Sequence, residues 1–243
     1  MSAHKTYTEL APWWPVLTPP QDYDERAAIL LGAIQEALDA PLGSLLELGA
    51  ATGHLATCID PRIEVVLNDL RPEMLAVSQE LNPAREHVQG DLRTLDLGRS
   101  FDAVLIHDVL MYLTEDGDLD AALQSAARHL RPGGVVLLAP DAVLETHQPG
   151  VASGGGDHPD GRSARLLEWH HEPDPSGRFR VDFAYLLQER EGSVRSLHES
   201  HTMRAWPLQD FLEAAAAAGL PEVTLLDTEL YGSVLIRGKM PTD

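Results

Sequence analysis

Residues 45–55 read Leu45-Leu46-Glu47-Leu48-Gly49-Ala50-Ala51-Thr52-Gly53-His54-Leu55, an apolar run that ends in an acid and then a turn of small residues. The run predicts a buried strand, and the glycine and alanine residues leave its turn without side-chain bulk, so a ligand can lie against the backbone. A helix that starts directly after such a turn offers free N–H groups and a positive dipole end. This geometry binds phosphates in dinucleotide folds, and it can equally hold the carboxylate of an amino-acid moiety.

Three acids follow short apolar runs along the chain. Glu47 closes the first run, Asp69 closes the run that begins at Ile63, and Asp91 follows the next one. Asp69 lies 20 residues beyond Gly49, close to the interval of about 20 residues at which an acid binds ribose hydroxyls in nucleotide-binding sheets. The spacing therefore predicts one nucleoside-bearing ligand across the tips of neighbouring strands.

Five motifs, in this order and at these intervals, resemble the core of the class I S-adenosylmethionine-dependent methyltransferases. They are Glu47–Gly53, Asn68–Leu75, Gly90–Leu92, Phe101–Asp108 and Leu130–Val135. The resemblance covers residues 45 to 141. One departure is Ala51, which stands where the family pattern usually has a third glycine.

The resemblance implies S-adenosylmethionine as the cofactor and assigns residues to it. Gly49, Ala50 and Gly53 would line the methionine half, beside the strand-end acid Glu47. Asp69 would take the ribose hydroxyls, with Leu70 and Met74 near the adenosine, and Asp91 would accept the adenine amino group beside Leu92. Tyr23 stands where a related tyrosine often points at the methionine part, although a half-buried structural aromatic is an equal alternative.

Strand and helix patterns alternate through this core, which predicts an α/β fold with a parallel sheet covered by helices on both faces. The expected strands are 45–49, 63–67, 87–89, 101–106 and 134–139, and the expected helices are 53–59, 72–80 and 117–130. Near the C-terminus, a helix at 207–219 precedes strands at 223–226 and 233–236. The resemblance implies a Rossmann-like seven-stranded sheet of order 3-2-1-4-5-7-6 with an antiparallel last strand.

Residues 142–205 interrupt that core. A glycine-rich loop at 153–161 precedes strand patterns at 165–169, 179–187 and 193–203, which predict an antiparallel β insertion after strand 5. The region resembles a subgroup of bacterial small-molecule methyltransferases, including sugar-amine N-methyltransferases, in which the insertion covers the acceptor pocket. We therefore expect an N-terminal helical and lid segment at 1–40, a cofactor-binding core at 41–141 and 206–243, and the insertion between its two parts.

Two histidines are the candidate catalytic bases. His107 ends the fourth core strand, where the family places residues beside both the sulfonium and the acceptor. His201 occupies the position of a recurring histidine in the subgroup, and strand alternation points it away from His198. The structural alternative for each is an ordinary hydrogen-bonded histidine. We expect no metal, because His107 and Asp108 are adjacent and lack a third ligand at useful spacing, while a zinc site among the insertion's histidines is a weaker alternative.

Charge and composition exclude several classes of function. The 243 residues carry 18 basic and 38 acidic side chains, a formal charge of −20, which disfavours nucleic acid and anionic membranes as partners. No apolar run approaches the roughly 18 to 20 residues of a membrane span. One cysteine, Cys58, cannot form an internal disulfide and fits a reducing, cytoplasmic location. The oligomeric state stays open, with a homodimer as one option.

The sequence thus predicts an S-adenosylmethionine-dependent methyltransferase (EC 2.1.1.-) that methylates N or O of a small-molecule metabolite or natural product. The sulfonium supplies the leaving group, so the protein mainly has to align a lone pair with the C–S bond. The alternative is a non-catalytic S-adenosylmethionine sensor or interaction module on the same fold. A nicotinamide oxidoreductase is disfavoured, because Gly49 and Gly53 lack the intervening glycine of the dinucleotide motif.

Overall fold

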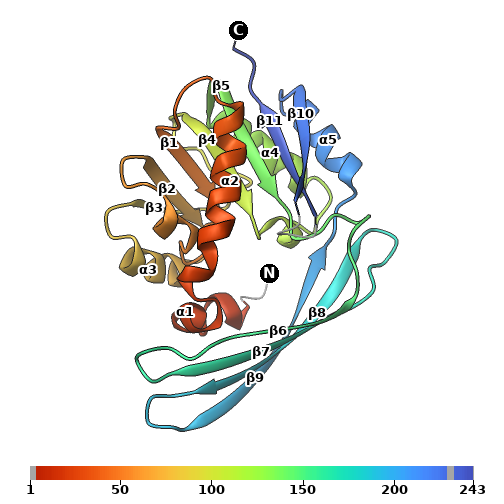
Figure 1. Cartoon of the computed structure of the whole chain (residues 1–243). Coiled ribbons are helices and arrows are strands. Elements are labelled where there is room, and N and C mark those ends of the chain that lie inside the picture. The colour runs from red at the N-terminus through yellow and green to blue at the C-terminus, as the bar shows by residue number, and fades with distance from the viewer. Residues whose placement is uncertain (1–3, 229–232, 243) are drawn as a thin grey trace.

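A seven-stranded sheet forms the larger part of the computed structural model, which describes residues 4–228 and 233–242 (Figure 1). Its strands run in the order β10-β11-β5-β4-β1-β2-β3. Their bounds are β1 Ser44–Leu48, β2 Glu64–Asp69, β3 Glu86–Gln89, β4 Phe101–His107, β5 Leu130–Ala139, β10 Glu222–Thr228 and β11 Ser233–Lys239. Counting only the strands of this sheet in chain order and reading from the β3 edge, the order is the predicted 3-2-1-4-5-7-6. The predicted Rossmann-like sheet is therefore confirmed.

The direction of the strands places the site. β1, β2, β3, β4 and β5 are parallel neighbours, whereas β11 pairs antiparallel with both β5 and β10, as predicted for the last strand. In register, Leu48 lies beside Asn68 and Asp69 lies beside Gln89. The carboxyl ends of the central strands therefore meet at one edge, where open α/β sheets bind their ligands.

Helices cover both faces of this sheet. α2 (Asp24–Ala37) crosses one face, and α4 (Asp118–Arg128) and α5 (Leu208–Ala217) pack on the other (Figure 1). α3 (Pro72–Leu81) follows β2. All seven residues of β4 are buried between these layers, and its centre, Ala103–Ile106, is the unbroken apolar run typical of a strand buried on both faces.

The helix expected at 53–59 is wrong in type. The structure has only a short 3₁₀ helix, η4 (Leu55–Cys58), after the turn. Gly53 adopts a φ of +67°, outside the right-handed helical region, so the helical conformation cannot start there. The chain then becomes extended again at Ile59, with φ −88° and ψ 133°, before a full α-helical turn can form.

The insertion is a separate antiparallel sheet of order β6-β7-β8-β9 (Figure 1). Its strands are β6 Gly150–Gly154, β7 Ser163–His170, β8 Arg178–Gln188 and β9 Val194–Arg204. The predicted antiparallel insertion is confirmed, but the sequence reading missed β6, whose five residues are all exposed. A strand with no buried face has no alternating pattern to reveal it. The proposed boundaries of the three segments stay a prediction.

The N-terminal segment lies between the two sheets and consists of a series of short helices. It contains η1 (Lys5–Tyr7), η2 (Ala11–Trp13), α1 (Trp14–Leu17) and η3 (Pro20–Tyr23). Leu10, Trp13 and Phe183 belong to one apolar cluster on the inner face of the insertion sheet. Trp13 is therefore a buried anchor, and a lid role for this segment stays a prediction. Within the described ranges, no helix has the length and hydropathy to cross a membrane.

Candidate active site

A cavity lies at the carboxyl ends of β1 and β2, the place where open α/β sheets bind their ligands. Five of the predicted cofactor residues line it, namely Gly49, Asp69, Leu70, Asp91 and Leu92. The other predicted residues are not among its lining, namely Tyr23, Glu47, Ala50, Gly53, Met74, His107 and His201. The structure therefore places most of the residues predicted to bind the adenosine at this cavity, but only Gly49 of those predicted to line the methionine part.

The turn after β1 tolerates no side chain at either glycine. Gly49 has φ +79°, and a Cβ there would lie 2.7 Å from a methyl of Val109. Gly53 has φ +67°, and its Cβ would lie 2.2 Å from the Ser78 hydroxyl. Glycine at these positions therefore satisfies both the backbone conformation and the close packing.

Ala51, between them, also adopts the left-handed conformation, with φ +49°. Its N–H donates to Asp69 Oδ2 at 2.9 Å, which holds the alanine in a conformation that costs an L-residue about 1–2 kcal/mol. We expect Ala51→Gly to raise the free energy of unfolding by up to about 1 kcal/mol, because glycine relieves this cost but gains entropy when unfolded. Urea unfolding of both proteins measures the difference.

Ala50→Gly is the matched control, since Ala50 is buried in the same turn but has no positive φ. It should not be stabilising. Equal stabilisation by both substitutions would contradict strain at Ala51.

Asp69 is built into the wall of the cavity. Its Oδ1 accepts the N–H of Arg71 at 2.8 Å and its Oδ2 accepts that of Ala51. Burial raises the pKa of this carboxyl, against the opposing effect of these N–H groups. Each oxygen retains a lone pair for a hydroxyl donor, as the proposed contact with a ribose requires.

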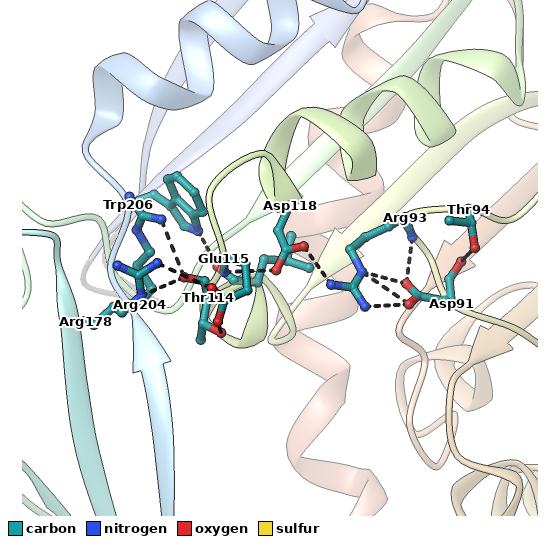
Figure 2. A network of polar contacts seen from close by, with 10 residues as sticks. Asp91, Arg93, Thr94, Thr114, Glu115, Asp118, Arg178, Arg204 and Trp206 are labelled. Atoms are coloured by element: carbon teal, nitrogen blue, oxygen red, sulfur yellow. Dashed lines mark hydrogen bonds and ion pairs between the residues drawn. The ribbon is translucent and has the colours of Figure 1, made fainter. Parts of the chain in front are cut away.

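Asp91 is paired with an arginine inside the cavity lining (Figure 2). Arg93 donates from Nε to Oδ1 at 2.9 Å and from Nη2 to Oδ2 at 2.6 Å, and this ion pair lowers the pKa of Asp91. Arg93 Nη1 also bonds Asp118 at 2.6 Å, at the start of α4. The carboxylate is therefore ionised and fixed in orientation, able to accept one more donor.

The polar network continues from α4 to the insertion (Figure 2). Asp118 Oδ2 accepts the N–H of Glu115 at 3.0 Å, and the carbonyl of neighbouring Thr114 accepts Arg178 Nε at 2.9 Å. Trp206 Nε1 donates to the Leu113 carbonyl at 2.8 Å. Since Leu113 and Thr114 line the cavity, these bonds hold its wall between the two sheets.

His107 is held in a buried charged cluster. Its Nε2 lies 2.8 Å from Glu47 Oε1 and its Nδ1 lies 3.3 Å from Asp108 Oδ2. Burial alone would lower the pKa of this imidazole, but Asp108 and Glu47 raise it to about 10. His107 is therefore protonated at neutral pH, a state in which it cannot accept a proton from a substrate.

Asp108 links this cluster to the cavity. It has φ +54° and lines the cavity, and its Oδ2 accepts Arg26 at 3.0 Å. Its other oxygen, Oδ1, is buried with no hydrogen-bond partner among the described residues. Burial would raise the pKa of this carboxyl, but its neighbours His107 and Arg26 lower it. Because Asp108 also lines the cavity, this carboxylate is a candidate contact for a cationic group of the ligand.

Asp141 is the third acid of the same cluster, and its burial together with the charge of Asp108 raises its pKa to about 7. Its pKa in the unfolded chain is near 3.9. The folded protein thus binds more protons between about pH 4 and 7, and stability falls as pH rises through that window. We expect Asp141→Asn to stabilise the protein by at least about 1 kcal/mol at pH 8 and by less at pH 5.

Urea unfolding at both pH values measures this difference. The control is Asp39→Asn, at an exposed acid. This substitution should change the free energy of unfolding by a similar amount at both pH values. A gain from Asp141→Asn that is independent of pH would contradict a carboxyl that titrates near neutrality.

A chain of three hydrogen-bonded side chains, Tyr7, Tyr112 and His201, lies at the cavity. Tyr7 donates its hydroxyl hydrogen to the Tyr112 oxygen at 2.6 Å, and the Tyr112 hydroxyl lies 2.9 Å from His201 Nδ1. Tyr7 and Tyr112 line the cavity, whereas His201 lies behind them with 1% of its surface exposed. Burial and the nearby His4 lower the pKa of His201 to about 4, so the imidazole is neutral at neutral pH.

The sequence reading missed Tyr7, Tyr112 and Asp108 as cavity residues. Asp108 and Tyr112 follow β4 directly, so their position in a strand-end loop was an available signal. Tyr7 carried no signal, because only the folded N-terminal segment brings it to the tips of the strands. Tyr23 instead packs its ring 5.4 Å from the ring of His54.

The strand order, the glycine turn and the acids beyond β2 and β3 together define a class I S-adenosylmethionine-dependent methyltransferase. A family model described as a methyltransferase domain matches residues 46–138. A dTDP-3-amino-3,4,6-trideoxy-alpha-D-glucopyranose N,N-dimethyltransferase of Streptomyces venezuelae is 30% identical over 179 residues, 73% of this chain and 75% of that protein. The chain belongs to this S-adenosylmethionine-dependent methyltransferase family.

Solved structures agree with this assignment. DesVI of Streptomyces venezuelae superimposes with a TM-score of 0.81 at 27% identity, covering 90% of this chain and 92% of its own. CalS10, an amino pentose methyltransferase of Micromonospora echinaspora solved with S-adenosylmethionine bound, gives a TM-score of 0.76 at 25% identity, covering 89% and 91%. The protein is thus a methyltransferase of small molecules that uses S-adenosylmethionine, as predicted.

Proposed function

We propose that this enzyme methylates the amino group of a nucleotide-linked amino sugar. The names of its relatives support the substrate class, since they include a dTDP-amino-sugar N,N-dimethyltransferase and an amino pentose methyltransferase. The observation that carries the proposal is the cavity itself, where the nucleoside acids Asp69 and Asp91 line the same space as the side chains of Tyr7 and Tyr112. That arrangement suits an adenosine at one end and a hydrogen-bonding acceptor at the other.

The proposed contacts of the cofactor follow from the wall of the cavity. Asp69 binds the ribose hydroxyls, Asp91 accepts the adenine amino group, and Leu70 and Leu92 flank the ring. The Asp108 carboxylate, which lines the cavity, accepts the α-ammonium group of the methionine moiety, a charged hydrogen bond worth roughly 1.5–3 kcal/mol. Ala50, Gly53 and Met74 are not among the residues that line the cavity, and their contact with the cofactor stays a prediction.

His107 has a positioning role in this proposal. Its ion pairs with Glu47 and Asp108 aim the latter carboxylate into the cavity and offset part of its charge. The sequence prediction of a catalytic base at this position therefore becomes a proposal of electrostatic support. Tyr23, packed on His54 outside the cavity lining, supports the turn of residues 49–53 from below.

The reaction is an in-line displacement at the S-methyl carbon. The amine lone pair forms the N–C bond as the C–S bond breaks, and the bonding electrons return to sulfur. The hydroxyls of Tyr7 and Tyr112 orient the amine about 3 Å from the methyl group, the distance of a near-attack geometry. The proton that nitrogen releases passes to water or, through Tyr112, to His201, whose Nδ1 lies within hydrogen-bond distance.

The charge of −20 supports the further proposal that nucleic acid is not a substrate. The single cysteine supports a reducing location such as the cytoplasm. The oligomeric state stays open, with a homodimer as one option.

Incubation of the enzyme with S-adenosylmethionine and a panel of dTDP-amino sugars tests the function. We expect release of S-adenosylhomocysteine and a sugar heavier by one or two methyl groups, measured by mass spectrometry. A matched panel with hydroxyl in place of the amine should give no product. Turnover of the hydroxyl panel alone would assign O-methylation, and cofactor binding without turnover of any acceptor would favour the sensor alternative.

A further inference from the structure

Three side chains that a metal ion could bind meet beside the acceptor end of the cavity. His4, Glu199 and His201 each offer one ligand atom, and these atoms all lie within 4.8 Å of one another. Glu199 and His201 are two residues apart on β9, so strand alternation places both on the inner face. His4 reaches them from the segment that precedes η1, and its ring centroid lies 3.7 Å from that of His201.

The inner nitrogen of His201 has the surroundings of a ligand. The residue is 1% exposed, and Nε2 has no hydrogen-bond partner among the described residues, although Glu199 Oε1 lies 3.2 Å away. The other ring nitrogen, Nδ1, already contacts the Tyr112 hydroxyl. Metal-binding histidines typically use one nitrogen for the ion and give the other to such an orienting partner.

Glu199 is fixed in place before any ion arrives. Its Oε2 accepts the N–H of Lys5 at 2.8 Å, and its Oε1 accepts the N–H of Thr6 at 2.7 Å as well as the Thr6 hydroxyl. These bonds hold the carboxylate against the two imidazoles and tie η1 to β9. A site whose donors are already oriented loses little conformational entropy when it binds an ion.

We propose that His4, Glu199 and His201 form a binding site for a divalent transition metal of the zinc class. Two imidazoles and one carboxylate match the preferences of Zn²⁺, whereas Ca²⁺ and Mg²⁺ require mainly oxygen ligands. Three protein ligands leave a fourth tetrahedral position open. His4 also lines the cavity, so the proposed site adjoins it.

Metal binding would act on the hydrogen-bond chain of the active site. When Nε2 of His201 binds the ion, its proton must lie on Nδ1, which then donates to the Tyr112 oxygen. Tyr112 can no longer use that nitrogen as an acceptor, and the ion also joins residue 4 to β9 over the cavity. Metal binding would thus close the proposed proton path from Tyr112 to His201; the binding itself does not depend on the proposed acceptor.

Titration of chelator-treated, full-length protein with Zn²⁺ alone, followed by calorimetry, tests the site. We expect one high-affinity ion per chain and a higher melting temperature when zinc is added. His4→Gln and Glu199→Gln should each weaken this binding at least about 10-fold, the lower end of what loss of a supporting group costs a metal site. Co²⁺ should replace Zn²⁺ and show the visible absorption of a tetrahedral site.

His198→Gln is the matched control, because His198 lies on β9 but faces solvent with a 65% exposed side chain. It should leave the affinity unchanged. His4 lies at the start of the described chain, so its substitution tests the site even if changes on β9 impair folding. The proposal would be overturned if the protein bound no zinc. It would also be overturned if the His4→Gln and Glu199→Gln variants bound zinc as tightly as the unchanged protein does.

Discussion

Asp69→Ala is expected to weaken the binding of S-adenosylmethionine by about 10- to 100-fold, without loss of the folded state. The carboxylate lines the cavity and accepts two backbone N–H groups, from Ala51 and Arg71. Its removal deletes the charged acceptor proposed for the ribose, and hydrogen bonds to charged groups contribute about 1.5–3 kcal/mol. It also releases the turn that carries Gly49. Calorimetric titration of the cofactor measures the change.

The control is Asp96→Ala. Asp96 also accepts a backbone N–H, that of Gly98 at 2.9 Å, but does not line the cavity. This variant should bind the cofactor as the unchanged protein does. An unaltered affinity in Asp69→Ala would refute the assignment of that carboxylate to the ribose, whatever the effect on stability.

Tyr112→Phe is expected to lower kcat by about 10- to 100-fold and to leave cofactor affinity nearly unchanged. The hydroxyl joins Tyr7 at 2.6 Å and His201 at 2.9 Å, so its loss leaves two buried polar groups without a partner. Each such group costs about 1–3 kcal/mol, and the amine loses a group that aligns it with the methyl carbon. Steady-state kinetics with an amino-sugar acceptor, and calorimetry with the cofactor, separate the two effects.

Tyr185→Phe is the matched control for this prediction. Tyr185 is a buried tyrosine whose hydroxyl bonds Thr6 at 2.6 Å, but it does not line the cavity. Its substitution should affect stability more than kcat. If Tyr112→Phe turns over at the unchanged rate, the acceptor is aligned by other groups, and a loss confined to cofactor binding would place Tyr112 in the wrong half of the cavity.

The two halves of the cavity differ in how far the sequence revealed them. The sequence could place Gly49, Asp69 and Asp91 at the site because each lies at or just after the end of a predicted strand. The parallel order of the sheet then brings these strand ends together. Tyr7 could not, because it lies more than a hundred residues before Tyr112 in the chain, and only the packing of the N-terminal segment joins them. Contacts of that range leave no local pattern in a single sequence.

The sequence also could not predict the protonation states of His107 and His201. His107 could be named as a residue of the site, but its protonation depends on Glu47 and Asp108, and Glu47 comes from a different strand. His201 is neutral for the opposite reason, since burial outweighs the nearby Glu199. Two histidines with the same predicted role therefore have pKa values on opposite sides of neutrality.

The sequence by itself determined the class of this protein, its cofactor and the order of its seven-stranded sheet. Apolar periodicity predicts each strand and helix from local sequence, and the five motifs resemble a known methyltransferase core, which implies the class, the cofactor and the strand order. The tertiary structure alone decided which polar groups line the cavity, which of them are charged, and that His4, Glu199 and His201 meet. Those properties depend on distances and burial between segments far apart in the chain, which the fold sets and no single stretch contains.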